Sequence, residues 1–426
     1  MTERGHAPGL PAAEADAPRA RRLELLLGLL VAAYLGLLAA HPGLFFDLGI
    51  THYGHWFIDT YALLASNDAA ARGLDPYAPN PLDYFGRPHV YSHWWLLLRH
   101  LGLTRSATPW VGGVLVGAFL LVALRLLRPR TPGQLLWSAA VLGAPPVVLA
   151  IERANNDLAI FLLLAPLPAC LLSRRRAAWW GGLGLVAVAT ALKYYPAAAA
   201  LPLVLEGGPG TFRRRAAAAA LVVGAALLSV AGNLASFGRL NPAPDGFLTF
   251  GAPLVFNYFG ATGAWVAIAG AALGASVAAA CFLARWPRVW TSPPAAARDH
   301  LRLVVGALLL TACFFSTRNY SYRFIFGLWL APALWSRLHD AGTPADLRRL
   351  ARLTAGLLLC VLWLDALACL GLNSGARGVA APTLLRWAAR TLALEQPCFW
   401  AFFCCLLAWL VHYVRTRAAA LLREPA

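Results

Sequence analysis

Apolar runs recur along nearly the whole chain, and short polar stretches separate them. Most of these runs are roughly 17–25 residues long, the length that an α-helix needs to cross a bilayer. The pattern predicts an all-α polytopic membrane protein with about twelve transmembrane helices. The predicted spans are residues 23–41, 108–127, 134–151, 157–173, 177–193, 196–207, 216–236, 260–284, 301–316, 323–336, 352–371 and 398–414.

Arginine clusters follow the ends of alternate predicted spans, so that they share one side of the membrane. Because short cytoplasmic loops carry an excess of Lys and Arg, this side is predicted to be the cytoplasm, inside a bacterial inner (plasma) membrane. Residues 1–22 and 415–426 are then cytoplasmic tails, and residues 23–414 form a single transmembrane domain. The clusters are Arg19/Arg21/Arg22, Arg125/Arg128/Arg130, Arg174–Arg176, Arg213–Arg215, Arg285/Arg288, Arg348/Arg349/Arg352 and Arg415/Arg417.

The net charge of +17 at pH 7 comes mainly from these short loops. It therefore indicates membrane topology and contact with the lipid bilayer, and no aromatic-basic motif points to a nucleic-acid partner. No glycine-rich phosphate loop is present, so a cytosolic nucleotide-using domain is not expected. Nearly all of the eight cysteines lie inside apolar runs, where Cys packs as a small hydrophobe, and neither a disulfide framework nor a CxxC metal site is predicted.

Four polar clusters collect on the side opposite the arginines. Ionisable groups at membrane depth are costly and are functional candidates by default. Because the four share one side, they predict a single active site on the outer face. They are Asp59–Tyr77, Glu152–Asp157, Lys193–Tyr195 and Arg318–Arg323.

The first outer loop, residues 42–108, is the longest stretch that does not span the membrane. Within it, Ile58–Ala71 is rich in Ala and Leu and lacks Gly and Pro, which predicts a helix along the interface. His93–Leu98 predicts a second interfacial helix with an aromatic anchor. Asp59 lies at the start of the first helix, where aromatic neighbours partly desolvate it. It is a candidate general base for a sugar hydroxyl, and the alternative is a helix cap.

The turn at 152–157 holds six polar residues where two would suffice. Asn155, Asn156 and Asp157 carry planar polar groups that suit hydroxyl recognition, although Asp157 could instead cap the next helix.

Lys193 is the only lysine in the chain and ends an apolar span. It is a candidate phosphate-binding ammonium at headgroup level, against the alternative of a lysine that only snorkels to the interface. Arg318 and Arg323 flank the entrance to another span, on the side that the positive-inside rule disfavours. Paired guanidiniums bind phosphate through bidentate hydrogen bonds, so this segment also predicts a phosphate site.

Taken in order, these motifs resemble a known family. The order is an acidic residue in the first outer loop, Tyr-x-x-x-Ala and Gly-x-x-Pro-Tyr after it, an Asn-Asn-Asp turn, a Lys-x-x-Pro at a span end, and an aromatic-Arg segment before a late span. This arrangement is similar to the polyprenol-phosphate-mannose-dependent α-mannosyltransferases of the multi-spanning (GT-C) glycosyltransferase superfamily. The resemblance extends through about residue 336.

The resemblance implies transfer of a hexose, with mannose as the first candidate, from a polyprenyl-phosphate donor to a lipid or glycan acceptor. Asp59 would be the catalytic base, and Lys193, Arg318 and Arg323 would hold the donor phosphate. Sugar and acceptor would contact Asn155, Asn156, Asp157, Tyr194 and Tyr322. No cofactor is implied, and no metal is expected because the first outer loop lacks a DxD pair. The run Asn80–His89 is more elaborate than the family pattern, which leaves the sugar and acceptor open.

Three other functions stay open. A transporter or lipid flippase would be expected to show internal symmetry and charges within its spans. An outer-face ligase or acyltransferase would use a histidine base, for which His52, His55, His89 and His93 are present. A non-catalytic assembly protein would leave the outer charges unexplained.

Overall fold

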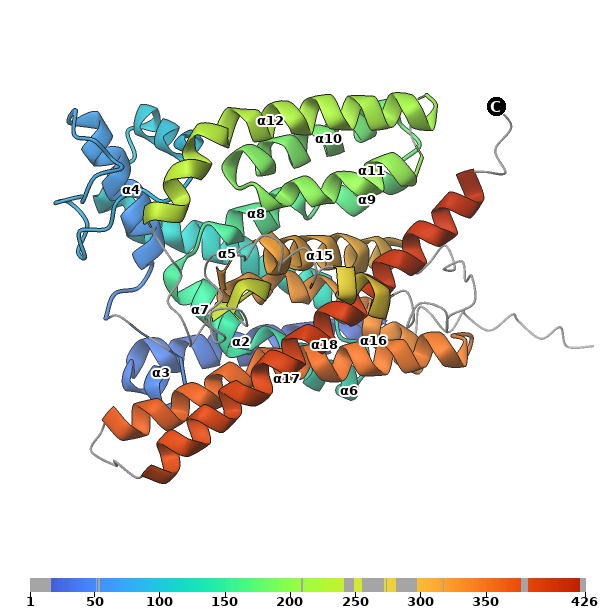
Figure 1. Cartoon of the computed structure of the whole chain (residues 1–426). Coiled ribbons are helices and arrows are strands. Elements are labelled where there is room, and N and C mark those ends of the chain that lie inside the picture. Colours follow the sequence, from blue (N-terminus) through green and yellow to red (C-terminus); the bar gives the residue numbers. More distant parts are fainter. Residues whose placement is uncertain are drawn as a thin grey trace, which may run out of the picture.

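The computed structural model describes residues 17–50, 52, 54–207, 210–240, 249–254, 272, 274–280, 297–316, 318–376 and 382–421. In these residues the fold is almost entirely helical (Figure 1). The strands described are β1 (Thr249–Phe250) and β2 (Asn319–Tyr320), which pair antiparallel. The predicted all-α class is confirmed.

Six of the described helices contain apolar segments of 20 to 26 residues, long enough to cross a membrane. The chain is therefore a membrane-embedded helical protein. These helices are α2 (Ala17–Ala40), α5 (Thr108–Leu127), α12 (Phe212–Leu240), α15 (Ala297–Ser316), α17 (Ala345–Ala376) and α18 (Pro382–Leu421).

A seventh span is possible if α6 (Pro132–Leu142) and α7 (Pro145–Arg153) count as one. They meet at a bend of 55°, where Pro145 and Pro146 cannot donate the backbone hydrogen bonds that would continue α6. The twelve predicted spans are not confirmed. Several fall on shorter pieces, and residues 260–284 lie mostly outside the described residues. The pieces are α8 (Asp157–Leu164), α9 (Leu167–Leu172), α10 (Arg176–Leu192), η3 (Tyr195–Ala199), α11 (Ala200–Leu205), η5 (Ser321–Trp329) and α16 (Ala331–His339).

The first outer loop contains α3 (Gly43–Asp47), α4 (Ile58–Ala71), and the 3-10 helices η1 (His93–Leu101) and η2 (Arg105–Ala107). The predicted helix Ile58–Ala71 has the observed bounds of α4. Most of its residues are buried, because α4 packs on η1, η2, α5 and α7. Figure 1 places α4 at one end of the helices, called here the α4 end.

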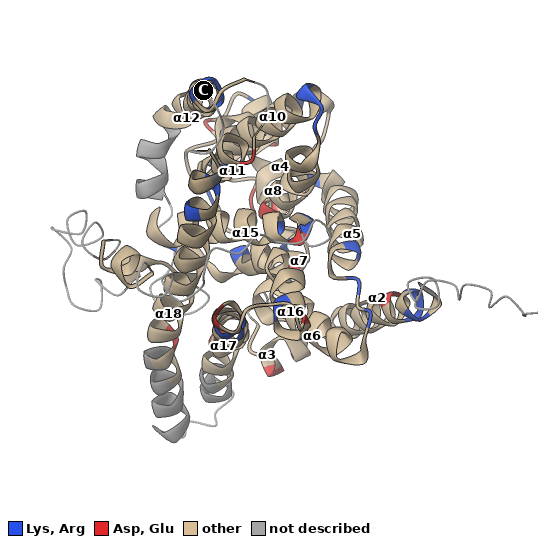
Figure 2. Cartoon of the chain, turned by 90° about the vertical axis from the view of Figure 1, so that its right-hand side faces the viewer, with Lys and Arg blue, Asp and Glu red and all other residues tan. Residues whose placement is uncertain are grey.

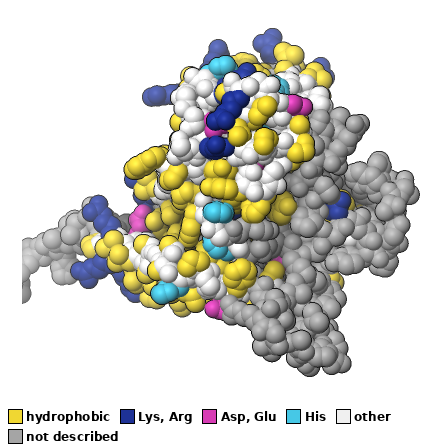
Figure 3. Space-filling view, turned by 90° about the vertical axis from the view of Figure 1, so that its left-hand side faces the viewer, with side chains coloured by type: hydrophobic (Ala, Val, Ile, Leu, Met, Phe, Trp, Pro, Cys, Tyr) yellow, Lys and Arg dark blue, Asp and Glu magenta, His cyan; other side chains and the backbone are white. Residues whose placement is uncertain are grey.

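The arginine clusters within the described residues lie away from the α4 end. Figure 2 looks at the molecule from the opposite end and shows basic segments at the ends of helices such as α2, α10 and α12. Figure 3 looks onto the α4 end, where basic, acidic and His side chains lie among hydrophobic ones. The clusters of consecutive arginines thus lie opposite the α4 end, where the basic side chains occur together with acidic and His side chains.

The 3-10 helix η5 lies at the centre of the core, between α7 and α15. Eight of its nine residues are buried, and Arg323 is the exception. Close contact with α15 requires Gly306, because a Cβ there would lie 2.6 Å from Leu330 Cδ1 and 2.9 Å from the Phe326 carbonyl oxygen. This packing fixes the position from which Arg323 reaches the polar centre of the protein.

Candidate active site

Two of the predicted clusters meet at the start of α4. The Phe57 amide donates to the Glu152 carbonyl oxygen (2.6 Å), and the Thr60 hydroxyl donates to the Ala154 carbonyl oxygen (2.7 Å). Phe57 and Ala154 both have positive φ, 64° and 42°. Such backbone strain in non-glycine residues is retained where the surrounding structure holds it, often at functional sites. These hydrogen bonds fix the first turn of α4 against the α7–α8 turn.

Asp59 lies at this junction and is not a helix cap. The N-cap of α4 is Phe57, without a side-chain capping bond. Asp59 Oδ2 accepts a 2.7 Å hydrogen bond from Asn155 Nδ2, while Oδ1 lies 3.5 Å from Arg87 Nη1 and 3.8 Å from Arg153 Nη1. The side chain is 7% exposed. We call Asp59, Asn155, Arg87 and Arg153 the Asp59 cluster.

Arg87 was not among the residues predicted from the sequence. Its guanidinium donates to both carboxylate oxygens of Asp83 (3.0 and 2.9 Å) and to the carbonyl oxygen of Ile58 (3.0 Å). Burial acts to lower the pKa of Arg87, but the hydrogen bond to Asp83 and the charge of Asp59 raise it above its ordinary value. Arg87 therefore stays charged beside Asp59. The sequence feature that could have pointed to Arg87 is its spacing of four residues from Asp83, the residue with which it pairs, within residues 80–89.

A second cluster forms around Asp157, which is fully buried. Its Oδ1 accepts from Lys193 Nζ (2.6 Å) and the Tyr195 hydroxyl (2.5 Å), and its Oδ2 lies 3.3 Å from Arg323 Nε. Asp157 was predicted to face the sugar, but three donors from α10's end, η3 and η5 already occupy it. We call Asp157, Lys193, Tyr195 and Arg323 the Asp157 cluster. With two cations and one carboxylate, it has a formal excess of one positive charge.

Asn155 joins the two clusters. Its Nδ2 donates to Asp59, and its Oδ1 accepts from the Asp157 backbone amide (2.8 Å). The neighbouring Asn156 is 4% exposed, and neither atom of its side-chain amide has a hydrogen-bond partner within the described residues. A buried amide with no partner carries a free-energy cost that a bound polar ligand would remove.

The other predicted residues lie around these clusters. Tyr322 is buried on η5, with its ring stacked on Tyr320 at 5.4 Å. The Tyr194 hydroxyl pairs with Ser316 Oγ (3.3 Å). The neighbouring Tyr195, which was not predicted as a site residue, contacts Asp157 instead. Arg318 lies just before β2 and is partly exposed, whereas Arg323 is held against Asp157. The two arginines predicted to act together thus occupy different environments.

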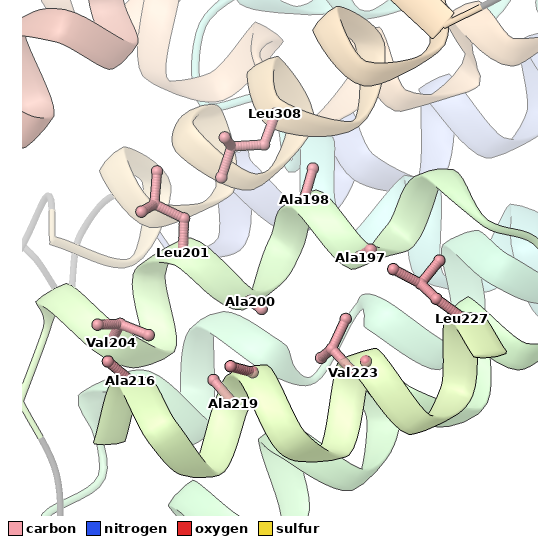
Figure 4. Close-up of a pocket in the computed structure, with 12 residues that line it drawn as sticks. Ala197, Ala198, Ala200, Leu201, Val204, Ala216, Ala219, Val223, Leu227 and Leu308 are labelled. Atoms are coloured by element: carbon pink, nitrogen blue, oxygen red, sulfur yellow. The ribbon is translucent and has the colours of Figure 1, made fainter. Parts of the chain in front are cut away.

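An apolar groove begins beside the Asp157 cluster. It has a volume of about 550 Å³ and lies between η3–α11 and α12, with Leu308 of α15 at its edge (Figure 4). Its lining consists of Ala, Val, Leu and Gly. The helix η3 contributes both Tyr195, which donates to Asp157, and the groove residues Ala197 and Ala198. One short element therefore connects a charged cluster to a hydrocarbon-like surface.

Comparison with models of known protein families, with curated proteins and with solved structures finds no match to this chain. Among the described residues, no group of three or more His, Cys, Asp or Glu side chains is placed to hold a metal ion.

Proposed function

We propose that the protein is an integral membrane glycosyltransferase. It moves a hexose, with mannose the first candidate, from a polyprenyl-phosphate donor to a lipid or glycan acceptor. The observation that carries the proposal is the linked pair of clusters: Asn155 connects a nearly buried carboxylate, Asp59, to Asp157, whose side chain holds the cations Lys193 and Arg323. Transfer of a sugar from a phosphate needs a base for the acceptor hydroxyl and a cationic site for the departing phosphate.

In the proposed reaction, Asp59 takes the proton from an acceptor hydroxyl. The oxygen of that hydroxyl forms a bond to the anomeric carbon, and the bond from that carbon to the phosphate oxygen breaks. Polyprenyl phosphate leaves with the electron pair. Asp59 Oδ1 is the atom suited to receive the proton, because its nearest cations lie at 3.5 and 3.8 Å while Oδ2 holds the shorter bond to Asn155.

The Asp157 cluster suits the departing phosphate. Lys193 is buried and Arg323 is 15% exposed, and Asp157 keeps these cations paired when no donor is present. The excess positive charge of the cluster would stabilise the negative charge that develops on the phosphate. In this mechanism Lys193 and Arg323 hold the phosphate. Arg318, which is partly exposed, would contact the donor or the acceptor only as it enters the site.

The groove suits the lipid part of the donor. A polyprenyl chain buries hydrocarbon, and a lining of Ala, Val and Leu offers it a matching surface beside the phosphate site. This same groove is the feature that favours the second candidate, a transporter of lipid phosphates, which would bind the donor without transferring its sugar.

The proposed orientation puts the α4 end on the outer face of a bacterial inner membrane, with both termini in the cytoplasm. It is supported by the arginine clusters at helix ends away from α4 and by the positive-inside rule. A lipid-linked donor fits this side, because nucleotide sugars are not available there.

The test uses purified protein in nanodiscs with labelled polyprenyl-phosphate mannose, a panel of other lipid-linked hexoses, and lipid extract from the host as acceptor. We expect release of free polyprenyl phosphate that requires the acceptor. Asp75→Asn is a matched control, because Asp75 is an exposed turn residue of the same outer loop. Binding of the donor with no release from any lipid-linked sugar would reject the transferase and favour the transporter.

A further inference from the structure

The run 80–89, of which the Asp59 cluster includes only Arg87, holds an exposed aromatic ring beside that cluster. The Phe85 side chain is 54% exposed, although Phe is among the residue types most often buried. The centre of its ring lies 5.4 Å from Arg87 Cζ, and Arg87 Nη1 lies 3.5 Å from Asp59 Oδ1. Because one guanidinium makes both contacts, the ring centre lies within about 10 Å of the candidate base.

Hydrogen bonds within the run hold the backbone on both sides of Phe85. The Asn80 amide donates to the Gly86 carbonyl oxygen (3.1 Å), and the Gly86 amide donates to the Asp83 carbonyl oxygen (3.1 Å). Asp83 Oδ1 accepts from the backbone amides of Phe85 (3.0 Å) and Arg87 (3.1 Å). The Phe85 ring is therefore exposed from a turn that its own hydrogen bonds fix.

The neighbouring Tyr84 anchors the run to α4. Its ring stacks on Tyr61 of α4, with ring centres 4.1 Å apart and an angle of 12° between the planes. It also stacks on His55, at 4.5 Å and 8°. The Tyr61 hydroxyl donates to the Leu82 carbonyl oxygen (3.1 Å), which adds a polar contact to the stack. These contacts fix the position of Phe85 relative to the first turn of α4.

The combination of an aromatic ring and a guanidinium suits a carbohydrate better than a hydrocarbon chain. The face of an aromatic ring is partly negative and attracts the C–H groups on one face of a pyranose. The hydroxyl groups at the edge of that pyranose can hydrogen-bond to a charged side chain such as Arg87. A lipid chain would contact the ring but would also cover the charges of Asp83 and Arg87, at a cost in free energy.

We propose that Phe85, beside Arg87, forms a binding subsite for the acceptor and that the acceptor is a glycan. The sugar unit that carries the reacting hydroxyl, or the unit before it, stacks on the Phe85 ring while the hydroxyl reaches Asp59. This inference rests on the proposed transferase function and narrows it, because a lipid without sugar has no pyranose face to stack. It also gives a function to the run 80–89, which the family resemblance left unexplained.

Two other roles for Phe85 predict different kinetics. Exposed aromatic side chains on the outer side of a membrane protein also serve as interfacial anchors, and leucine would preserve an apolar anchor in Phe85→Leu. A ring that only supports Arg87 would be lost in Phe85→Leu, which would lower kcat through Asp59. Stacking on the acceptor predicts a third pattern, in which the acceptor KM rises while kcat and the donor KM stay nearly unchanged.

The experiment uses the full chain in nanodiscs, with polyprenyl-phosphate mannose and other lipid-linked hexoses as donors. Three acceptor fractions are prepared from the host envelope: lipids without sugar, glycolipids and water-soluble glycans. We expect transfer only to a fraction that contains sugar. Phe85→Leu should raise the KM for that fraction by about tenfold, whereas Phe85→Trp should keep it near the wild-type value. Trp110→Leu is the matched control and should not change it, because Trp110 is 79% exposed at the start of α5 and lies outside both clusters.

The failures are distinguishable. If the wild-type protein releases no polyprenyl phosphate from any donor with any fraction, the proposed function fails, and the acceptor subsite fails with it. If it transfers sugar to the lipids without sugar, the function stands and the glycan acceptor is overturned. If Phe85→Leu keeps the wild-type acceptor KM, the function stands and the subsite is overturned. An unchanged kcat would then favour an interfacial anchor, and a lower kcat would favour a ring that supports Arg87.

Discussion

The two carboxylates at the centre of this protein are held in different ways. Asp157 has no exposed surface and is surrounded by three short-range donors, whereas Asp59 has a small exposed surface and two guanidiniums at 3.5 and 3.8 Å. A carboxylate whose oxygens are fully engaged serves best as a fixed counterion. One with a loosely held oxygen can exchange a proton. This difference is the reason why the proposed mechanism gives Asp157 the role of counterion and Asp59 the role of base.

The largest effect is expected when Asp157 loses its charge. Asp157→Asn leaves the buried Lys193 and the mostly covered Arg323 without a counterion, which should destabilise the protein by about 3–5 kcal/mol. Thermal unfolding in detergent measures the change, with Asp75→Asn as the exposed control. Adding Lys193→Met to Asp157→Asn removes one unpaired cation and should recover part of the loss. If Asp157→Asn alone is as stable as the wild-type protein, Asp157 is not the fixed counterion that distinguishes it from Asp59.

Acid should weaken the Asp59 region before the Asp157 cluster, because the loop that carries Arg87 contains His89. Burial lowers the pKa of His89 to about 4. The unfolded chain then binds this proton as the pH falls below about 6.5, while the folded protein resists it down to about pH 4. The stabilising contribution of neutral His89 is thus present above pH 6.5 and lost as the pH falls towards 4, by up to about 3 kcal/mol.

Hydrogen exchange followed by mass spectrometry checks this expectation. Between pH 6.5 and 4, after correction for intrinsic rates, residues 76–93 should lose protection while the segments around Asp157 and Lys193 keep it. A His89→Gln variant should show a flatter pH response in the loop. Equal loss of protection in both regions would mean that the loop does not titrate independently.

Filling the groove should affect the donor alone. Ala219 lines the groove on α12 and is nearly buried. Ala219→Phe occupies space assigned to the lipid chain, so the KM for the polyprenyl-phosphate donor should rise by about tenfold, the equivalent of about 1.4 kcal/mol of binding. The KM for the acceptor should not change, because the proposed mechanism places the acceptor at Asp59. Ala217→Phe, at an exposed position of the same helix outside the groove lining, is the matched control. Similar increases for donor and acceptor would contradict a groove that serves only the Asp157 side.

The sequence predicted the elements of this site better than their connections. The bounds of α4 follow from local chemistry, since Ile58–Ala71 lacks Gly and Pro and Gly73 follows soon after. The pairing of Asp59 with Asn155, 96 residues away, depends on how α4 packs against α7, and no local pattern contains it. The contacts of Asp157 with Lys193 and Arg323 likewise appear only when α8, α10 and η5 are assembled, so the sequence could not predict them.

The number of spanning helices also differs between the sequence prediction and the described structure: twelve were predicted, and six or seven are long and apolar enough to span. Apolar composition predicts membrane depth, but the prolines in 145–146, 166–168 and 196–202 divide apolar runs into short helices. A run can therefore lie within the membrane region without crossing it as one straight helix. Arg87 was missed because a charged pair in a loop is usually solvated, and only tertiary packing brings this one to Asp59.

The most direct test of the central assignment compares Asp59→Asn and Asp59→Glu with wild-type protein in nanodiscs. Single-turnover release of polyprenyl phosphate and the unfolding temperature are measured on the same samples. The account predicts that Asp59→Asn unfolds close to the wild-type temperature while transfer falls about 10²–10⁴-fold, and that Asp59→Glu retains measurable transfer. Turnover within a few-fold of wild type in a well-folded Asp59→Asn protein would contradict the assignment of Asp59 as the base.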